Sequence, residues 1–182
     1  MDAPSITIEF PQKRSRLTTF FRFLLAIPLF IFGYFYEILA LIAAIVAWFA
    51  LVFTARYPAS LYRFTSGYVR FYMRLVSYAF IVVDKYPPFS GGEYPDYPVQ
   101  IAIPERKERY SRLKAFFRLI YILPILILLY VLMLVFCVLD VLAWLCALIA
   151  GRVPGFIQNY MRFTLGWLLK YEALFLLLTE NY

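Results

Sequence analysis

Two acidic side chains stand inside long apolar stretches of this 182-residue chain. Glu37 interrupts the run 23–53, and Asp140 interrupts the run 119–150. A carboxyl group at membrane depth is costly unless it is neutral or paired, which makes such a residue a candidate proton site, ion site or partner for an arginine. We expect Glu37 to lie near the turn of a helical hairpin, where a carboxylate costs little. For Asp140 we expect an internal salt bridge or hydrogen bond, with a role in transport as the second interpretation.

The other side chains offer no pattern for catalysis or metal binding. The chain has no histidine, which removes the commonest general base and metal ligand. It also lacks a phosphate-binding glycine loop and the GxSxG, HExxH and CxxC motifs. Cys137 and Cys146 would lie about 13 Å apart along one helix, too far for a disulfide. We therefore predict a protein that is not an enzyme and that holds no cofactor and no metal.

Basic residues flank both apolar runs and form the larger set of candidates. Lys and Arg number 18 against 11 Asp and Glu, a net charge of +7. Cations beside apolar spans are typical of cytoplasmic loops and of contacts with anionic lipid headgroups, so lipid and acidic protein partners are predicted and nucleic acid is not. The candidate lipid- or partner-binding residues are Arg16, Arg22, Arg56, Arg63, Arg70, Arg74, Arg112, Arg118, Arg152, Arg162 and Lys170.

The composition indicates an integral membrane protein. Hydrophobic residues make up 64% of the chain and charged residues 16%, and the mean hydropathy is +0.74. A soluble domain is nearer half apolar and about a quarter charged. A wholly buried subunit of a large assembly is the alternative. The N-terminal segment begins acidic and lacks the features of a signal peptide, so the first apolar run would itself direct insertion.

An internal repeat organises the chain. Residues 15–28 read SRLTTFFRFLLAIP, and residues 111–124 read SRLKAFFRLIYILP. The same offset carries Trp48 to Trp144, Arg56 to Arg152, Pro58 to Pro154, Asp84 to Glu180 and Tyr86 to Tyr182. We predict two tandem copies of one unit, with a first membrane repeat at 1–90, a Gly/Pro linker at 91–96 and a second membrane repeat at 97–182. Because Tyr86 is followed by Pro-Pro-Phe, we also expect the natural chain to continue beyond Tyr182.

Each copy is predicted to begin with an extended segment. Residues 5–11 (SITIEFP) and 98–104 (PVQIAIP) alternate in polarity, as strands or surface strips do. These two segments are candidates to pair with each other. The stretch 86–98 between the copies is rich in proline and glycine, so we predict a turn and an extended linker there.

The length of each apolar run leaves two interpretations open. A helix over 23–53 would be about 46 Å long, against a hydrocarbon core of about 30 Å. The run is therefore longer than one transmembrane helix needs and shorter than two transmembrane helices need. Both of its ends are basic, and the positive-inside rule then places both ends in the cytoplasm. That favours a transmembrane helical hairpin in each copy over one long helix kinked at Pro28 or Pro124.

A third helix is predicted after Pro58 and after Pro154. In the first copy Arg63, Arg70 and Arg74 fall on one stripe of an otherwise aromatic and aliphatic helix. This pattern is typical of an amphipathic helix lying in the membrane interface, although an ordinary solvated face would give it as well. The fold class is thus all-α and membrane-embedded, with a pseudo-twofold axis along the membrane normal relating the copies.

The repeated pattern resembles the bacterial membrane family known as the domain of unknown function DUF4389, in two copies. The residues that carry the resemblance are Ser15, Arg16, Leu17, Phe21, Arg22, Pro28, Trp48, Arg56, Tyr57, Pro58, Arg74, Tyr78, Asp84, Tyr86, Pro87, Pro88 and Phe89, then Ser111, Arg112, Leu113, Phe117, Arg118, Pro124, Trp144, Arg152, Pro154 and Tyr182. The resemblance implies a fold and carries no activity.

The sequence thus predicts a non-enzymatic polytopic protein of the bacterial cytoplasmic membrane with a cytoplasmic N-terminus. Its expected role is that of an accessory or scaffold subunit of a membrane complex, in contact with anionic lipid and acidic partner surfaces. The alternative is a small transporter or lipid-handling protein with a site between the two repeats.

Overall fold

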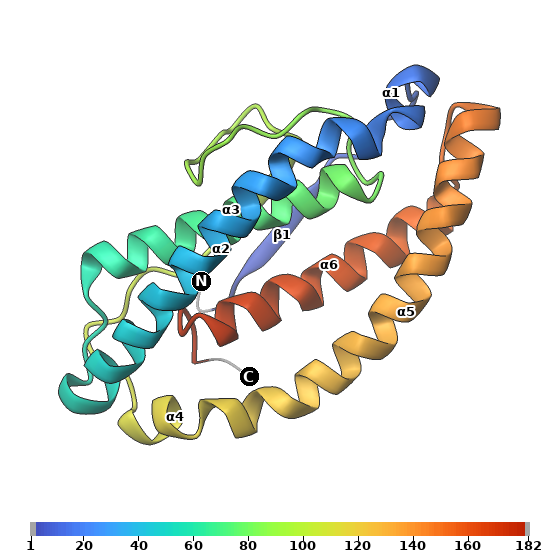
Figure 1. The fold of residues 1–182 in the computed structure, drawn as a ribbon. Coiled ribbons are helices and arrows are strands. Elements are labelled where there is room, and N and C mark those ends of the chain that lie inside the picture. The colour runs from blue at the N-terminus through green and yellow to red at the C-terminus, as the bar shows by residue number, and fades with distance from the viewer. Residues whose placement is uncertain (1–2, 181–182) are drawn as a thin grey trace.

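The computed structural model describes residues 3–180 and shows the same order of elements twice (Figure 1). The first copy contains β1 (Ser5–Ile8), α1 (Arg16–Phe20), α2 (Arg22–Thr54) and α3 (Ala59–Ala79). The second contains β2 (Val99–Ala102), α4 (Arg112–Phe116), α5 (Arg118–Ala150) and α6 (Gly155–Phe175). Corresponding helices have equal lengths, which confirms the duplication; Tyr182, matched to Tyr86, lies outside the described residues.

The repeated serine starts the helical part of each copy. The Oγ atoms of Ser15 and Ser111 accept hydrogen bonds from the backbone N–H groups of Thr18 and Lys114, which makes both serines N-caps. The short helices that follow end at Phe21 and Phe117, and the long helices begin at the next residue. The Phe-Phe-Arg motif therefore marks a break between a one-turn helix and a long one.

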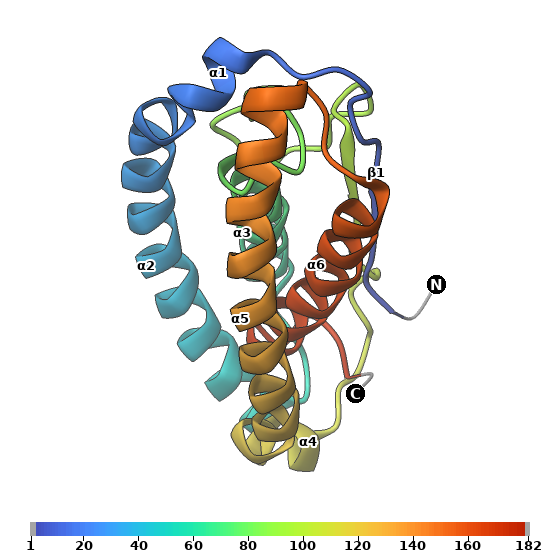
Figure 2. The same cartoon turned by 90° about the vertical axis from the view of Figure 1, so that its right-hand side faces the viewer.

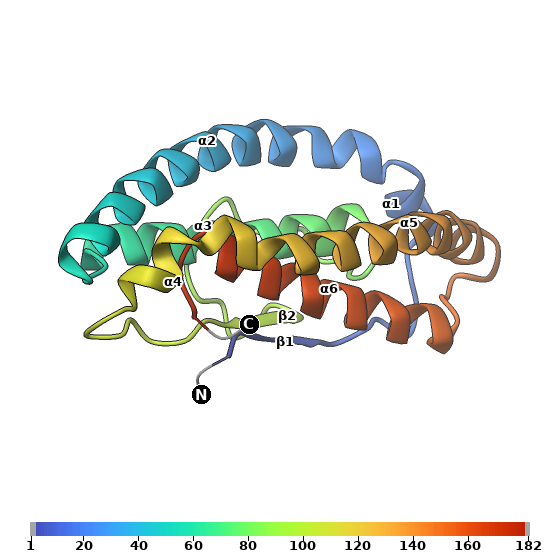
Figure 3. The same ribbon diagram turned by 90° about the horizontal axis from the view of Figure 1, so that it is seen from below.

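The hairpin prediction is wrong, because each apolar run forms a single helix of 33 residues. Neither run contains a sequence that is typical of a tight turn between two helices. The one glycine of α2, Gly33, packs against Leu75, and α5 contains no glycine. Pro28 and Pro124 lie inside α2 and α5, which curve along their length (Figure 3). Glu37 consequently lies in the middle of a helix and not at a turn.

The third helix of the first copy differs from its prediction as well. Fourteen of the 21 residues of α3 are buried, because α3 packs against α2, α6 and β2 at once. It is therefore an internal helix rather than one that lies along a membrane interface. Its counterpart α6 packs on α5, α3 and β1 and keeps more residues exposed, among them Asn159 and Arg162.

The two extended segments do pair, as their alternation indicated. β1 and β2 form an antiparallel two-stranded sheet, with Ser5 opposite Ala102 and Ile8 opposite Val99. Ile8 and Val99 are buried beneath α3 and α6. The sheet packs on α3 and α6, while α2 packs on α3 and α5 on α6, and Figures 2 and 3 show α2 and the sheet on opposite sides of the molecule.

The copies are joined at both ends of the long helices. The N–H of Arg14 donates to the carbonyl of Gly151 at 2.9 Å, and the N–H of Tyr110 donates to that of Ala55 at the same distance. These equivalent bonds place α1 beside the C-terminus of α5 and α4 beside that of α2, so the long helices run antiparallel. Both copies contribute to one hydrophobic core.

The residues that end the long helices offer a matched test of backbone strain. Both adopt the left-handed conformation, at φ 55° for Ala55 and 66° for Gly151. Alanine is strained there and glycine is not. We expect Ala55→Gly to stabilise the fold by about 1 kcal/mol and Gly151→Ala to destabilise it by about as much. Denaturant unfolding in detergent micelles measures both, and equal effects of the same sign would contradict this assignment.

Candidate functional site

A buried arginine at the start of each long helix donates to carbonyl oxygens at or just after the end of the third helix. Arg22 donates through Nη1 to the carbonyl oxygens of Tyr78 at 2.9 Å and Val83 at 2.8 Å. Its Nη2 pairs with Asp84, which also accepts from Arg14 Nη1 at 2.9 Å. The guanidinium group of Arg22 thus satisfies one of the last carbonyls of α3 and opposes the negative end of the helix dipole.

The second copy contains an equivalent contact between an arginine and a backbone carbonyl. Arg118 Nη1 donates to the carbonyl oxygen of Thr179 at 2.7 Å, the position equivalent to Val83. The side chains of Arg22 and Arg118 are buried, with residue exposures of 1% and 3%. Their expected contacts with lipid phosphate are therefore replaced by contacts within the chain.

Asp140 lies near this cluster from the other copy. Its carboxyl group lies close enough to interact with Arg22 and Arg14, the two arginines that already share Asp84. The Oδ1 atom of Asp140 is buried and, among the described residues, has no hydrogen-bond partner. The structure thus brings a second carboxyl group near the two arginines that share Asp84, where α5 packs on α1. Neither the salt bridge nor the hydrogen bond expected for Asp140 is found among the described residues.

The arginines of α3 hold the Gly/Pro linker. Arg74 is buried, donates through Nη1 to the carbonyl of Gly92 at 2.8 Å, and stacks over the ring of Tyr94 at 5.0 Å. Arg70 Nη2 pairs with Glu93 at 2.8 Å. These two residues therefore face the chain's own linker rather than a lipid surface. A Cβ atom at Gly91 would come within 2.4 Å of the Gly67 backbone, so the linker lies directly against α3.

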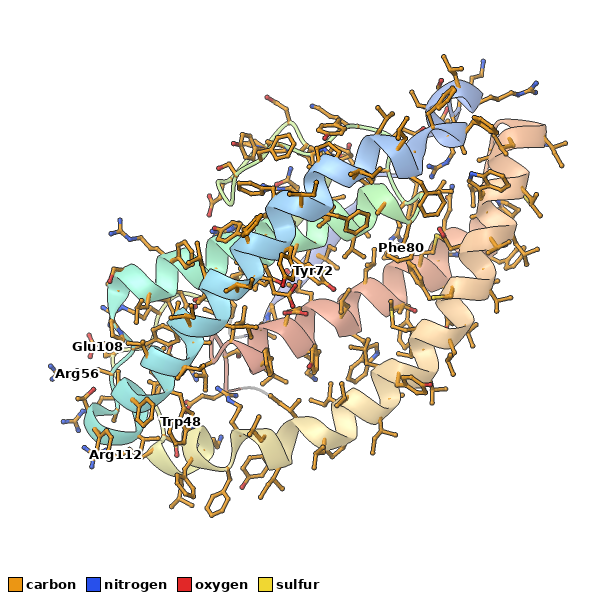
Figure 4. The ribbon with its side chains drawn as sticks, viewed as in Figure 1. Trp48, Arg56, Tyr72, Phe80, Glu108 and Arg112 are labelled. Atoms are coloured by element: carbon orange, nitrogen blue, oxygen red, sulfur yellow. The ribbon has the colours of Figure 1, made fainter. Side chains whose placement is uncertain are left out.

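The exposed basic candidates fall into two groups. Four lie at the ends of the long helices, namely Arg16, Arg56, Arg112 and Arg152. At one end, Lys13, Arg14, Arg16 and Arg152 line a shallow groove around Gly151. Arg56 and Arg112 lie at the other end of the molecule, where Figure 4 also labels Glu108.

The remaining candidates lie on the third helices. Arg63 is exposed near the start of α3. On α6, Arg162 stacks over the ring of Phe10, next to the sheet, and Lys170 lies over the ring of Trp167, each at 5.0 Å. These cations are therefore separate from the basic groups at the ends of α2 and α5.

A second acidic feature lies between the copies. Glu37 of α2 and Glu172 of α6 line a cavity of about 220 Å³ together with Tyr68 of α3 and Tyr171 of α6. Tyr72, labelled in Figure 4, lies close enough to both carboxylates to feel their charge. Burial, and secondarily the charge of Glu37, raises the pKa of Glu172 to about 8. Glu172 therefore holds its proton at neutral pH, which lets the two carboxylates coexist.

Sequence reasoning missed Glu172. It is the one acidic residue of α6, and it follows Lys170 on a helix interpreted as a cationic surface. The repeat did not indicate a pair of acidic residues, because the offset of 96 residues maps Glu172 to Val76 and Glu37 to Met133. The signal that could have found it is its position two turns beyond Thr164, on the side of α6 that faces the first copy. The described residues contain no group of three or more His, Cys, Asp or Glu that could hold a metal.

The raised pKa of Glu172 gives a pH dependence with a definite sign. The folded state holds this proton up to about pH 8, whereas the ordinary glutamate pKa is 4.5. Between these values the folded state binds more protons than the unfolded state, so the free energy of unfolding falls as pH rises. We expect Glu172→Gln to flatten that slope in detergent unfolding experiments at pH 5, 6.5 and 8.

The control for this experiment is Glu108→Gln, which removes an exposed carboxylate at the end of the molecule. This variant should keep the slope of the wild type. A Glu172→Gln protein with the wild-type slope would show that the cavity does not hold a proton on Glu172.

The family model described as domain of unknown function (DUF4389) matches twice, over residues 16–91 and 112–182. No curated protein and no solved structure matches the chain. Each match covers one set of three helices, so the repeat seen in the sequence, the structure and the family model is the same.

Proposed function

From the premise that this chain belongs to the DUF4389 family in two tandem copies, we propose that it is a non-enzymatic protein of the bacterial cytoplasmic membrane. Its long helices α2 and α5 lie in lipid, and its exposed basic residues contact anionic headgroups. In this role it serves as an accessory or scaffold subunit of a membrane complex.

The observation that carries this proposal is the apolar surface of the long helices. α2 and α5 are both long and apolar enough to cross a membrane, and only 28% and 17% of their most apolar segments is buried. Phe23, Phe53 and Ile149 are each more than 70% exposed. A core helix of a soluble protein would be mostly buried, and an apolar patch of this extent is typical of a membrane or partner interface.

Charge supports the same proposal. Arg16, Arg56, Arg112 and Arg152 are exposed at the ends of the apolar helices, where phosphate groups of a bilayer would lie. The buried arginines Arg22, Arg74 and Arg118 already have partners inside the chain and are not part of the proposed lipid surface.

A second candidate function is a small transporter or lipid-handling protein. The cavity between Glu37 and Glu172 favours it, because its lining residues come from both copies and one of its carboxyl groups holds a proton at neutral pH. Unchanged flux or lipid transfer in Glu172→Gln would count against this candidate.

Membrane integration can be tested by charging the apolar surface. The double variant Ile42→Glu/Val138→Glu alters one residue exposed by more than half on each long helix. Each substitution places a charge in the proposed lipid surface, where entry into hydrocarbon is costly. We expect the double variant to leave the membrane fraction after alkaline carbonate washing, whereas the wild type stays in it.

The matched control is Thr7→Glu/Ala102→Glu, which adds the same two charges to exposed positions of the sheet. This protein should remain in the membrane fraction. A wild-type protein that carbonate extracts completely would refute membrane integration. Purification in mild detergent followed by mass spectrometry tests the scaffold role, which a lone chain without protein partners would contradict.

A further inference from the structure

We infer that the molecule lies in one leaflet of the membrane, with α2 and α5 parallel to its plane and both basic ends in the same layer of anionic headgroups. This inference rests on the proposed function, because it specifies how the long helices meet lipid. The lipid surface is defined by the outward side chains of α1, α2, α4 and α5.

The length of the long helices argues against spanning. A helix of 33 residues is about 50 Å long, well beyond a hydrocarbon core of about 30 Å. The exposed apolar side chains continue along nearly the whole of α2, from Phe23 to Phe53, and of α5, from Leu119 to Ile149. A spanning orientation would leave many of these side chains in headgroups or water, whereas an in-plane orientation covers all of them.

The sheet gives an independent argument. β1 and β2 lie near the middle of the length of the molecule, and among the described elements they pack on α3 and α6 and contact neither α2 nor α5 (Figures 1 and 3). A bilayer crossed by the long helices would therefore surround a two-stranded sheet with open edges, and lipid cannot satisfy those backbone groups. It would also surround Glu93 of the linker, whose side chain is 77% exposed. With α2 and α5 in plane, the sheet and linker face water.

The exposed large hydrophobic side chains are concentrated on the long helices and on the short helices that precede them, which also favours the in-plane orientation. Among the described residues, only six exposed large hydrophobic side chains lie outside α1, α2, α4, α5 and the residues that join them. These six are Phe64, Tyr86, Phe89, Tyr94, Phe156 and Phe163. The layer made by α2 and α5 is therefore the apolar face of the molecule, as an interfacial protein requires.

The basic residues at both ends of the molecule favour the cytoplasmic leaflet and its anionic lipids. Because α2 and α5 are antiparallel, each end of the molecule combines the start of one long helix with the end of the other, and both ends are basic. A spanning orientation would place one basic end outside the cytoplasm, against the positive-inside rule. An in-plane orientation places both in the cytoplasmic leaflet, where anionic lipids supply phosphate groups. The pseudo-twofold axis then runs along the membrane normal.

Cysteine labelling in oriented membrane vesicles distinguishes the two orientations. In a background with Cys137 and Cys146 changed to serine, Lys13→Cys, Glu108→Cys and Glu93→Cys report on the two ends and the linker. We expect a membrane-impermeant maleimide to label all three from the cytoplasmic side only. Labelling of positions 13 and 108 from opposite sides would overturn the in-plane orientation and leave membrane integration intact.

Vesicle flotation tests the lipid partner. The variant with Arg16, Arg56, Arg112 and Arg152 changed to glutamate should lose its preference for phosphatidylglycerol-containing over phosphatidylcholine vesicles, by about fivefold for each cation removed. Arg162→Glu, beside the sheet, should keep that preference. A quadruple variant with the wild-type preference would overturn the headgroup contact. A wild-type protein that floats with neither vesicle and elutes as a soluble dimer would mean that a second copy covers the apolar face, which refutes the proposed function itself.

Discussion

The contact on which this fold depends is the one between the arginine at the start of each long helix and the carbonyl oxygens at the end of the third helix. Arg22 reaches the last turn of α3 and pairs with Asp84, and Arg118 reaches the corresponding carbonyl after α6. A buried guanidinium group is tolerated only when it is paired and hydrogen-bonded, and backbone carbonyl oxygens at or just after the helix end supply two of the three acceptors of Arg22. This contact fixes the antiparallel packing of a long helix on a shorter one.

The helix pair α2–α3 and the helix pair α5–α6 each cover surface that the other would leave exposed. A single copy would expose the inner faces of α3 and its strand, and the second copy covers them through α6 and the paired strand. The tryptophans reinforce the junctions at both ends, since Trp48 Nε1 donates to the carbonyl of Ala115 and Trp144 Nε1 to that of Thr19. The result is a molecule with an apolar outer layer and a polar side built from the sheet and linker.

The helix starts and the strands could be predicted because each depends on a short stretch of neighbouring residues. The repeat of SRL and FFR located the start of each helical set, and alternation in SITIEFP and PVQIAIP indicated the strands. The prediction for the long helices was wrong because basic residues at both ends of each apolar run were taken to lie on the same side of the membrane, which requires a hairpin. The observed antiparallel pairing of two single helices gives the same charge pattern. The arginines were assigned to lipid because sequence shows no partner for Arg22, whose acceptor Asp84 lies far along the chain.

The junctions at both ends of the long helices have a consequence for how the two copies can differ. Equivalent bonds, such as that from Arg14 to Gly151 and that from Tyr110 to Ala55, form an isologous interface like that of a twofold-symmetric dimer. In a true dimer every residue would appear on both sides of the axis. Joined in one chain, the halves can hold different residues at matched positions, and Glu37 and Glu172 each lack an acidic counterpart in the other copy. Covalent linkage thus permits one asymmetric cavity on a symmetric frame.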